Sequence, residues 1–303
     1  MKNPQENTPI NPEQVPKEVY NIYNDYAHSR IDRKEFMEKL SVFAIGGLTV
    51  SSLTSFLTPN YDDKIQIKKG DPRITEEVVE YASPKGGGKI KGLLCKPKNL
   101  NGKVGGVVVV HENRGLNPHI EDVARRAAVA GFISFAPDAL SPLGGYPGND
   151  DDGRTLQSQR NRDEMLEDFI AAGEYLLKRE ENNGKLGVVG FCFGGWVSNM
   201  MAARMPNLSA SVPYYGGQAV LEWVPQIKAP LQLHYAENDE RVNAGWPPYE
   251  EELKKHQKTY EVYFYPGTHH GFHNDTTPRF DPEAAQLSWE RTLAFFNKHL
   301  STP

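Results

Sequence analysis

Short apolar runs alternate with helical segments over residues 75–300. The runs at residues 107–110, 132–135, 186–189, 229–235 and 260–265 end in polar or glycine-rich turns, as buried strands do. Helices are expected over residues 120–130, 162–179, 196–205, 249–256 and 282–300. Residues 76–82 and 89–96 predict an opening antiparallel pair of strands joined by three glycines. The alternation predicts an α/β fold with a mostly parallel central sheet flanked by helices.

The first 70 residues have a different character and form an N-terminal extension. Residues 1–17 are polar and dotted with proline, residues 18–40 have a helical composition, and residues 59–71 resemble a linker. Residues 41–57 form a moderately apolar run with two glycines and several hydroxyl residues. This run is too polar to predict a stable membrane span.

Two interpretations of the extension stay open. Residues 32–37 resemble a twin-arginine export motif in which lysine replaces the second arginine, although no A-x-A cleavage site follows residue 57. Alternatively, residues 19–56 form an amphipathic arm that packs on the rest of the chain or on a second subunit, which would make a homodimer. The first interpretation predicts a periplasmic protein and the second is compatible with a cytoplasmic one.

The sequence Gly-Phe-Cys-Phe-Gly-Gly at residues 190–195 follows a predicted strand directly. Glycines two positions before and two positions after Cys192 let a strand turn sharply into a helix, which is typical of a nucleophile elbow with cysteine in place of serine. The helix that follows directs its free N–H groups toward the sulfur and favours the thiolate. The alternative interpretation is a small buried thiol in a glycine-rich turn.

Two more residues complete an ordered set with Cys192. Asp239 lies in the turn after the run 229–235, and His270 lies in the loop after the run 260–265. The order nucleophile, acid, histidine is the one that α/β-hydrolases use. Asp239 alone would be a turn former and His270 alone a solvated loop residue, but their joint placement favours catalysis.

The chain from about residue 75 to residue 300 resembles the dienelactone hydrolase family of α/β-hydrolases, which are carboxymethylenebutenolidase-like enzymes. The elbow at residues 190–195, the Gly-x-x-His-Gly-Phe loop at residues 267–272 and the turn at Asp239 carry the resemblance. A further match is Glu112, which stands where the family has a glutamate that interacts with the resting cysteine. The resemblance implies an α/β-hydrolase catalytic domain over residues 71–303 behind the extension of residues 1–70.

The activity that the resemblance implies is hydrolysis of carboxylic esters or lactones through a thioester. Cys192 would attack the carbonyl carbon, His270 would activate water, and Asp239 would orient the imidazole. A non-hydrolytic thiol redox sensor or a binding module on the same scaffold is the alternative. Neither of these would need the pairing of Asp239 with His270.

Three supporting roles are also expected around the thiol. The backbone N–H groups of Phe193 and Asn113 would bind the oxyanion, whatever their side chains. The resemblance gives Glu112 a gating role, in which bound substrate displaces the carboxylate from the thiol. A surface salt bridge with a nearby arginine is the alternative interpretation of Glu112.

The sequence departs from the family pattern at a position that contacts the substrate. Family members that act on dienelactones hold an arginine four residues after the catalytic histidine, where this chain has Asn274. Arg160 and Arg162 are candidates for binding a substrate carboxylate, and Tyr215 is a candidate for contact with the substrate. The alternative for the two arginines is a solvated, self-paired helix start beside three aspartates.

Composition excludes several other classes of protein. The chain has 303 residues, of which 38% are hydrophobic and 24% charged, and a net charge of −5. The acidic balance argues against a nucleic-acid partner, and no metal or cofactor motif is present. The hydrolase loop explains His269, His270 and His273 better than a metal site does. Only two cysteines exist, and Cys95 is expected to be an inert buried thiol.

Overall fold

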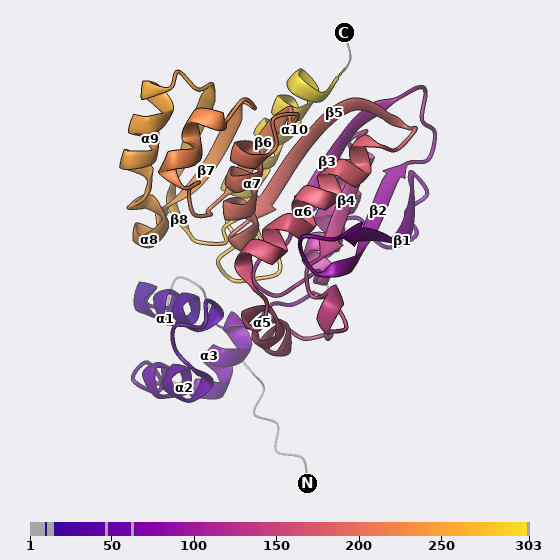
Figure 1. The fold of residues 1–303 in the computed structure, drawn as a ribbon. Coiled ribbons are helices and arrows are strands. Elements are labelled where there is room, and N and C mark those ends of the chain that lie inside the picture. Colours follow the sequence, from indigo (N-terminus) through magenta and orange to yellow (C-terminus); the bar gives the residue numbers. More distant parts are fainter. Residues whose placement is uncertain (1–9, 11–14, 46–47, 62–63, 302–303) are drawn as a thin grey trace.

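The architecture is an eight-stranded sheet with helices on both faces and three further helices at one end (Figure 1). The computed structural model describes residue 10 and residues 15–45, 48–61 and 64–301. The strands are β1 (Ile74–Ser83), β2 (Gly88–Pro97), β3 (Val104–Val110), β4 (Ile133–Asp138), β5 (Asn182–Phe191), β6 (Ala210–Tyr214), β7 (Leu231–Asn238) and β8 (Tyr260–His269). The helices are α1 (Lys17–Ala27), α2 (Arg33–Ser41), α3 (Val50–Leu57), α4 (Pro118–Val129), α5 (Asp150–Ser158), α6 (Arg162–Leu177), α7 (Phe193–Arg204), α8 (Glu240–Asn243), α9 (Trp246–Lys255) and α10 (Pro282–Leu300), with short 3-10 helices at Ser141–Leu143 and Leu221–Gln226.

The strand order is β1-β2-β4-β3-β5-β6-β7-β8. The pairs β1·β2 and β2·β4 are antiparallel, and the strands from β4 through β3 to β8 pair in parallel. Parallel strands bring their carboxyl ends to one edge of the sheet, which is where open α/β sheets bind ligands. The loops after β3, β5, β6, β7 and β8 therefore lie at a common edge.

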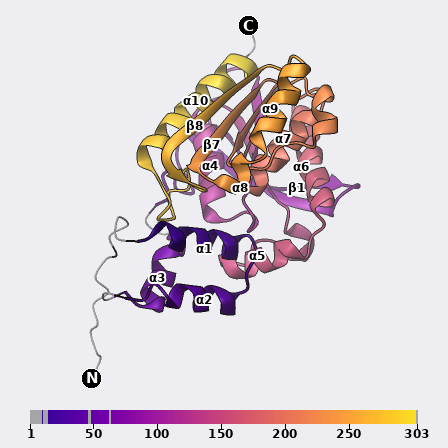
Figure 2. The ribbon, with the colours of Figure 1, turned by 90° about the vertical axis from the view of Figure 1, so that its left-hand side faces the viewer.

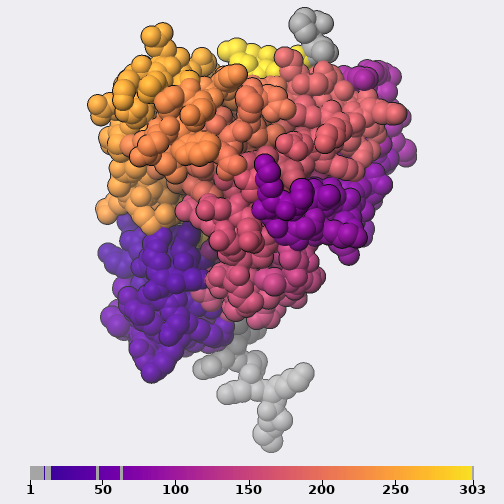
Figure 3. All heavy atoms as spheres, viewed as in Figure 1, coloured from indigo at the N-terminus to yellow at the C-terminus, as the bar shows by residue number. Residues whose placement is uncertain are grey.

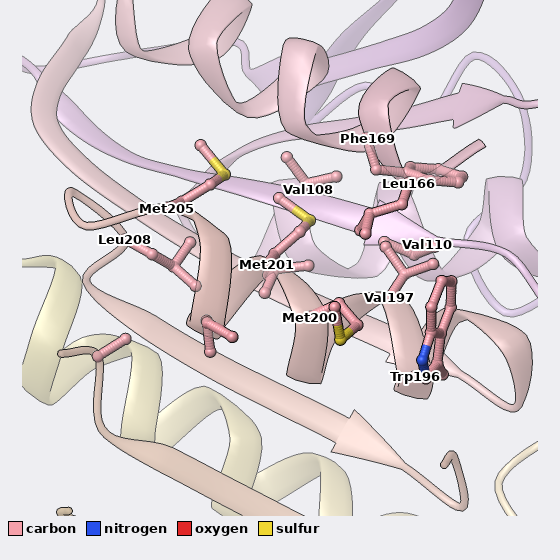
Figure 4. Close-up of a cluster of buried hydrophobic side chains, with 14 of the residues drawn as sticks. Val108, Val110, Leu166, Phe169, Trp196, Val197, Met200, Met201, Met205 and Leu208 are labelled. Carbon is pink, nitrogen blue, oxygen red and sulfur yellow. The ribbon is translucent and has the colours of Figure 1, made fainter. Parts of the chain in front are cut away.

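Two hydrophobic clusters cover the two faces of the sheet. Apolar side chains of α6, α7 and α9 pack on one face, and those of α4 and α10 pack on the other. Figure 2 shows α10 and α9 on opposite sides of the strands. Figure 4 shows Met201 and Val197 of α7 on the side of that helix that faces Val108 of β3 and Leu166 of α6. Strands buried on both faces are apolar where they are buried, which is why β3 and residues 186–189 of β5 appear in the sequence as continuous apolar runs.

The predicted α/β fold is confirmed, including the antiparallel opening pair. The structure differs in two places from the expected helices. A separate helix, α5, precedes α6, and it is capped by Asn149, whose side chain accepts a hydrogen bond from Asp152 N at 2.9 Å. Three aspartates in its first turn suit the positive end of the helix dipole. The segment 18–40 is broken into α1 and α2 by a turn in which Ser29 has a left-handed φ of 56°.

The helices α1, α2 and α3 form an N-terminal arm with a small core of its own. Val19, Tyr23, Leu40, Leu53 and Leu57 meet in this core and are buried. The core is separate from the two clusters on the sheet, so the arm is a distinct packing unit. The space-filling view shows the arm in direct contact with the rest of the molecule (Figure 3).

Polar and aromatic contacts attach the arm to α5. The Arg154 guanidinium lies 3.9 Å from the centre of the Tyr26 ring and donates to Tyr26 O at 2.5 Å. The Tyr26 hydroxyl donates to Asp151 at 2.8 Å, and Arg33 pairs with the same carboxylate at 2.6 Å. Arg33 belongs to the segment that resembles an export motif, and in this structure it belongs to the interface with α5.

The segment after the arm also lies against the rest of the chain. Asn60 N donates to Thr276 O at 2.8 Å, and Gln66 N and Ile67 N donate to the buried Asp122 carboxylate at 3.0 and 2.7 Å. In the part of the chain that the structure describes, no helix has the length and apolar character that crossing a membrane requires. The two glycines of the apolar run 41–57 lie outside the described residues, and export, dimerisation and localisation stay predictions.

Candidate active site

The turn between β5 and α7 presents Cys192 at the carboxyl edge of the sheet. Cys192 has a φ of 58° and a ψ of −109°, a conformation that residues other than glycine rarely adopt. The residues two positions before and after it must be glycine, because a Cβ at Gly190 would lie 2.0 Å from Gly194 O and one at Gly194 would lie 2.4 Å from Val110 O. The sequence motif and the sharp turn therefore have the same steric cause.

The loops after β7 and β8 bring Asp239 and His270 together. His270 Nδ1 lies 2.6 Å from Asp239 Oδ2, and both side chains are about 4% exposed. The carboxylate fixes the tautomer with a proton on Nδ1, so Nε2 is left to serve a reacting group. Burial lowers the pKa of His270, but Asp239 and Cys192 outweigh that effect and raise it to about 9.

Two imidazoles surround the Cys192 sulfur. His28, the residue that follows α1 of the arm, forms a 3.1 Å contact between its Nε2 and Sγ. The His28 and His270 rings meet edge to face at 5.0 Å, and the ligand atoms of the three residues lie within 4.8 Å of one another. Burial raises the pKa of the Cys192 thiol, but His28 and His270 outweigh burial and hold the pKa well below its usual range. The arrangement stabilises a thiolate.

The acidic loop residue after β3 has a partner other than the thiol in this conformation. Glu112 is 5% exposed, and its Oε2 accepts a hydrogen bond from Asn274 Nδ2 at 3.0 Å. Asn274 thus binds Glu112 at the position where the family holds an arginine. The gating role of Glu112 stays a prediction.

The two expected oxyanion donors line the same cavity as the thiol. Phe193 is the first residue of α7, where the backbone N–H has no partner within the helix. Asn113 lines the same cavity as Cys192, and its side chain donates to Ala27 O at the end of α1. The oxyanion site stays a prediction that these positions are compatible with.

A cavity of about 460 Å³ opens beside the sulfur, and it is strongly cationic. Five arginines line it, and none of its other lining residues is acidic: Arg30, Arg154, Arg160, Arg162 and Arg241. Arg160 is engaged by the buried Asp168 at 2.9 Å. Arg162 stacks on Trp196 at 3.5 Å, and neither Arg162 nor Arg241 has an ion pair among the residues with described positions. These two cations are free to bind an anion.

Tyr215 also faces this cavity and was expected to contact the substrate. Its hydroxyl is buried without a hydrogen-bond partner, and burial raises its pKa well above the usual range. A buried hydroxyl without a partner is costly unless a bound molecule supplies one. Tyr215 is therefore a candidate donor to substrate.

The three histidines of the loop after β8 do not form a shared cluster. His270 pairs with Asp239, His269 stacks on Tyr20 of the arm at 5.4 Å, and His273 is buried against Phe191 at 5.0 Å. The one group in the described part of the chain with the spacing of a metal site is His28, Cys192 and His270.

The sequence alone did not identify His28. Its contact with Cys192 joins residues 164 positions apart. His28 lies in a segment of helical composition with no chemical motif around it. Only the docking of the arm brings it to the site, and nothing in the sequence predicts where the arm docks.

Comparison with known proteins finds separate family matches for two parts of the chain. A model described as the dienelactone hydrolase family matches residues 90–300, and a model described as YqhI-like matches residues 9–44. A relative from Escherichia coli (strain K12), named "Putative hydrolase fragment YghX", is 56% identical over 112 residues, or 37% of this chain and 96% of the relative. A "Putative carboxymethylenebutenolidase" from Synechocystis is 30% identical over 235 residues, or 70% of this chain and 93% of the relative. The crystal structure of a "Putative Dienelactone Hydrolase" from Klebsiella pneumoniae matches with a TM-score of 0.65 and 25% identity, over 74% of this chain and 100% of that chain.

The two cysteines should differ widely in reactivity, because their surroundings shift the thiol pKa in opposite directions. Burial raises the pKa of Cys95 to about 12. Iodoacetamide at neutral pH should therefore modify Cys192 more than about a hundredfold faster than Cys95 in the folded protein. Mass spectrometry of quenched samples measures both rates, and the denatured chain is the control in which the two should react alike. Similar rates in the folded protein would contradict the electrostatic description of the site.

Proposed function

The chain belongs to the dienelactone hydrolase family and is a hydrolase of ester or lactone bonds, and we propose that it acts through a thioester on Cys192. The observation that carries the proposal is the thiolate environment of Cys192 beside a buried Asp239–His270 pair. A redox sensor would need a reactive thiol, but it would not need a histidine such as His270 that Asp239 orients to act as general acid and base. The proposed reaction has two half-reactions.

In the first half-reaction the Cys192 thiolate attacks the carbonyl carbon and an S–C bond forms. The tetrahedral oxyanion accepts hydrogen bonds from Phe193 N–H and Asn113 N–H. As the C–O bond breaks, protonated His270 donates its Nε2 proton to the leaving alkoxide, and Asp239 keeps the ring oriented. The product is the alcohol, or the opened hydroxyl end of a lactone, and the enzyme holds a thioester.

In the second half-reaction neutral His270 removes a proton from water, and the resulting hydroxide attacks the thioester carbonyl. The C–S bond breaks and returns the thiolate and the carboxylic acid product. The low pKa of Cys192 makes the thiolate a good leaving group at this step. Glu112, which is bonded to Asn274 in this conformation, is proposed to change partners when substrate binds.

The substrate is proposed to carry a negative charge close to the scissile bond. Arg162 and Arg241 have no carboxylate partners within the described chain and line the cavity beside Sγ. Desolvation lowers the pKa of Arg162, so an anion there would restore a favourable environment for its charge. Arg162 and Arg241 would then take the role of the arginine that Asn274 replaces.

Removal of the sulfur tests the proposed nucleophile. Cys192→Ala should fold normally and lose turnover of a short-chain aryl ester, and Cys192→Ser should be folded but slower by roughly a hundredfold or more, because a hydroxyl needs a stronger base. Release of the phenol measures turnover, and Cys95→Ser is the control that should stay active. Wild-type turnover by Cys192→Ala would refute the mechanism.

The pH dependence should show that His270 acts in its protonated form. Because Asp239 and Cys192 raise the pKa of His270 to about 9, kcat/KM should hold through neutral pH and fall as the pH rises through that value. Asp239→Asn removes the neighbouring negative charge, so the alkaline limb should move to lower pH and kcat should fall by roughly a thousandfold or more. His269→Ala is the control. An alkaline limb unmoved in Asp239→Asn would count against this role for His270.

Substrate charge can be tested with two esters that differ by one carboxylate. Arg162→Ala or Arg241→Ala should lower kcat/KM for a half-ester of a dicarboxylic acid by roughly 10- to 100-fold, the loss of one charge-assisted hydrogen bond. The corresponding neutral ester should be affected far less. Arg73→Ala, which alters an arginine paired with Asp71, is the control. Equal losses for both esters would refute an anion site at these arginines.

A further inference from the structure

The N-terminal arm places His28 against the proposed nucleophile, and we propose that His28 is a second catalytic imidazole that stabilises the Cys192 thiolate. The arm would then be a working part of the active site. This inference rests on the proposed role of Cys192. It adds a catalytic group that comes from outside the α/β-hydrolase domain.

The hydrogen bonds of His28 define its protonation. His28 Nδ1 lies 2.6 Å from Asn24 O, a carbonyl oxygen that can only accept, so Nδ1 carries a proton. Nε2 faces Cys192 Sγ at 3.1 Å. A thiolate on that side requires a proton on Nε2, because two lone pairs would otherwise face each other. His28 is therefore an imidazolium whenever Cys192 is a thiolate in this geometry.

His270 has the same arrangement, with Nδ1 on Asp239 and Nε2 left for the sulfur. Its Nε2 has no hydrogen-bond partner in this conformation, so the direct bond to Sγ comes from His28. A thiol has one proton to offer, whereas a thiolate can accept hydrogen bonds from two imidazoliums. A thiol between two neutral rings can therefore serve only one Nε2, and ionisation of the sulfur removes that limit.

Charge balance supports this state in a buried site. The thiolate and Asp239 carry two negative charges, and His28 and His270 carry two positive ones, so the set is neutral. The other charged groups that face the cavity are the arginines named above as its lining, and they also favour a thiolate. Glu112 is the nearby acid, and its carboxylate is bonded to Asn274.

The arm holds His28 through the end of α1. The last carbonyl groups of a helix lack partners within the helix, and here the catalytic domain supplies them: Arg154 donates to Tyr26 O and Asn113 donates to Ala27 O. His28 follows immediately, as the C-cap residue of α1. The contacts that attach the arm thus also position the imidazolium.

The proton on His28 is kept through both half-reactions. In the resting enzyme the thiol proton has moved from Sγ to Nε2 of His28, while His270 holds its own proton. His270 gives that proton to the leaving alkoxide and regains one from water. His28 donates a hydrogen bond to the thiolate before attack and again when the thiolate leaves, so it lowers the energy of the sulfur anion at both steps.

The test is alkylation of Cys192 against pH in the full chain, measured both with and without EDTA. His28→Ala should raise the apparent pKa of Cys192 and slow its alkylation near pH 6 by about tenfold or more, since one pKa unit is a factor of ten in thiolate. His28→Gln keeps a neutral donor and should lose less. In both variants kcat/KM should fall more at pH 6 than at pH 8. Lys34→Ala, an exposed change on the same arm, should match wild type.

Three outcomes would overturn the proposal. An unchanged alkylation profile would mean that the ring only packs on the sulfur. Alkylation that is faster by the same factor at every pH would mean that His28 only covers the thiol. A defect that appears without EDTA and disappears with it would point to a metal ion held by both histidines and the thiolate. Failure of the proposed function is separate, since it would appear as turnover by Cys192→Ala.

Discussion

The sharp left-handed turn at Cys192 is the constraint on which the site depends. Holding a non-glycine residue in that conformation costs on the order of 1–3 kcal/mol, and the surrounding sheet and helix must supply it. Cys192 N donates to Tyr214 O at 3.1 Å, and Gly190 and Gly194 leave room for the close approach of neighbouring backbone. The turn presents the sulfur at the edge of the sheet where the loops after β3, β6, β7 and β8 meet and where the arm docks.

The fold could be predicted from the sequence because its signals are local. Buried parallel strands give continuous apolar runs, and the elbow gives paired glycines around Cys192, so the sheet, its flanking helices and the chain positions of Asp239 and His270 follow from patterns a few residues long. The meeting of Asp239 and His270 follows in turn from the parallel sheet, which brings the ends of β7 and β8 together. Arg162 was a candidate through the family resemblance, as one of two arginines that could bind a substrate carboxylate.

The parts that could not be predicted depend on packing between distant segments. Arg241 lies at the start of α8 and has no motif around it, yet it faces the same cavity as Arg162. Arg160 looks equivalent to Arg162 in sequence, but the buried carboxylate of Asp168 engages only Arg160. His28 is the extreme case, because its position depends on how a separate three-helix unit docks. A pattern of polar and apolar residues indicates which surfaces are buried, but it does not indicate which surfaces meet.

The arm changes what the catalytic domain can do in two ways. It contributes His28 to the thiol and Arg30 to the wall of the cavity, so the same segment affects both the nucleophile and the cationic field that a substrate meets. Its attachment is mostly polar and cationic–aromatic, through Arg154, Tyr26 and Asp151, while its own apolar core stays apart from the sheet. Such an interface is sensitive to salt and to the charge of its arginines to a degree that a hydrophobic one is not. Docking of the arm and ionisation of Cys192 are therefore linked. The docked arm brings the His28 cation that stabilises the thiolate, and the thiolate in turn attracts that cation and so favours docking.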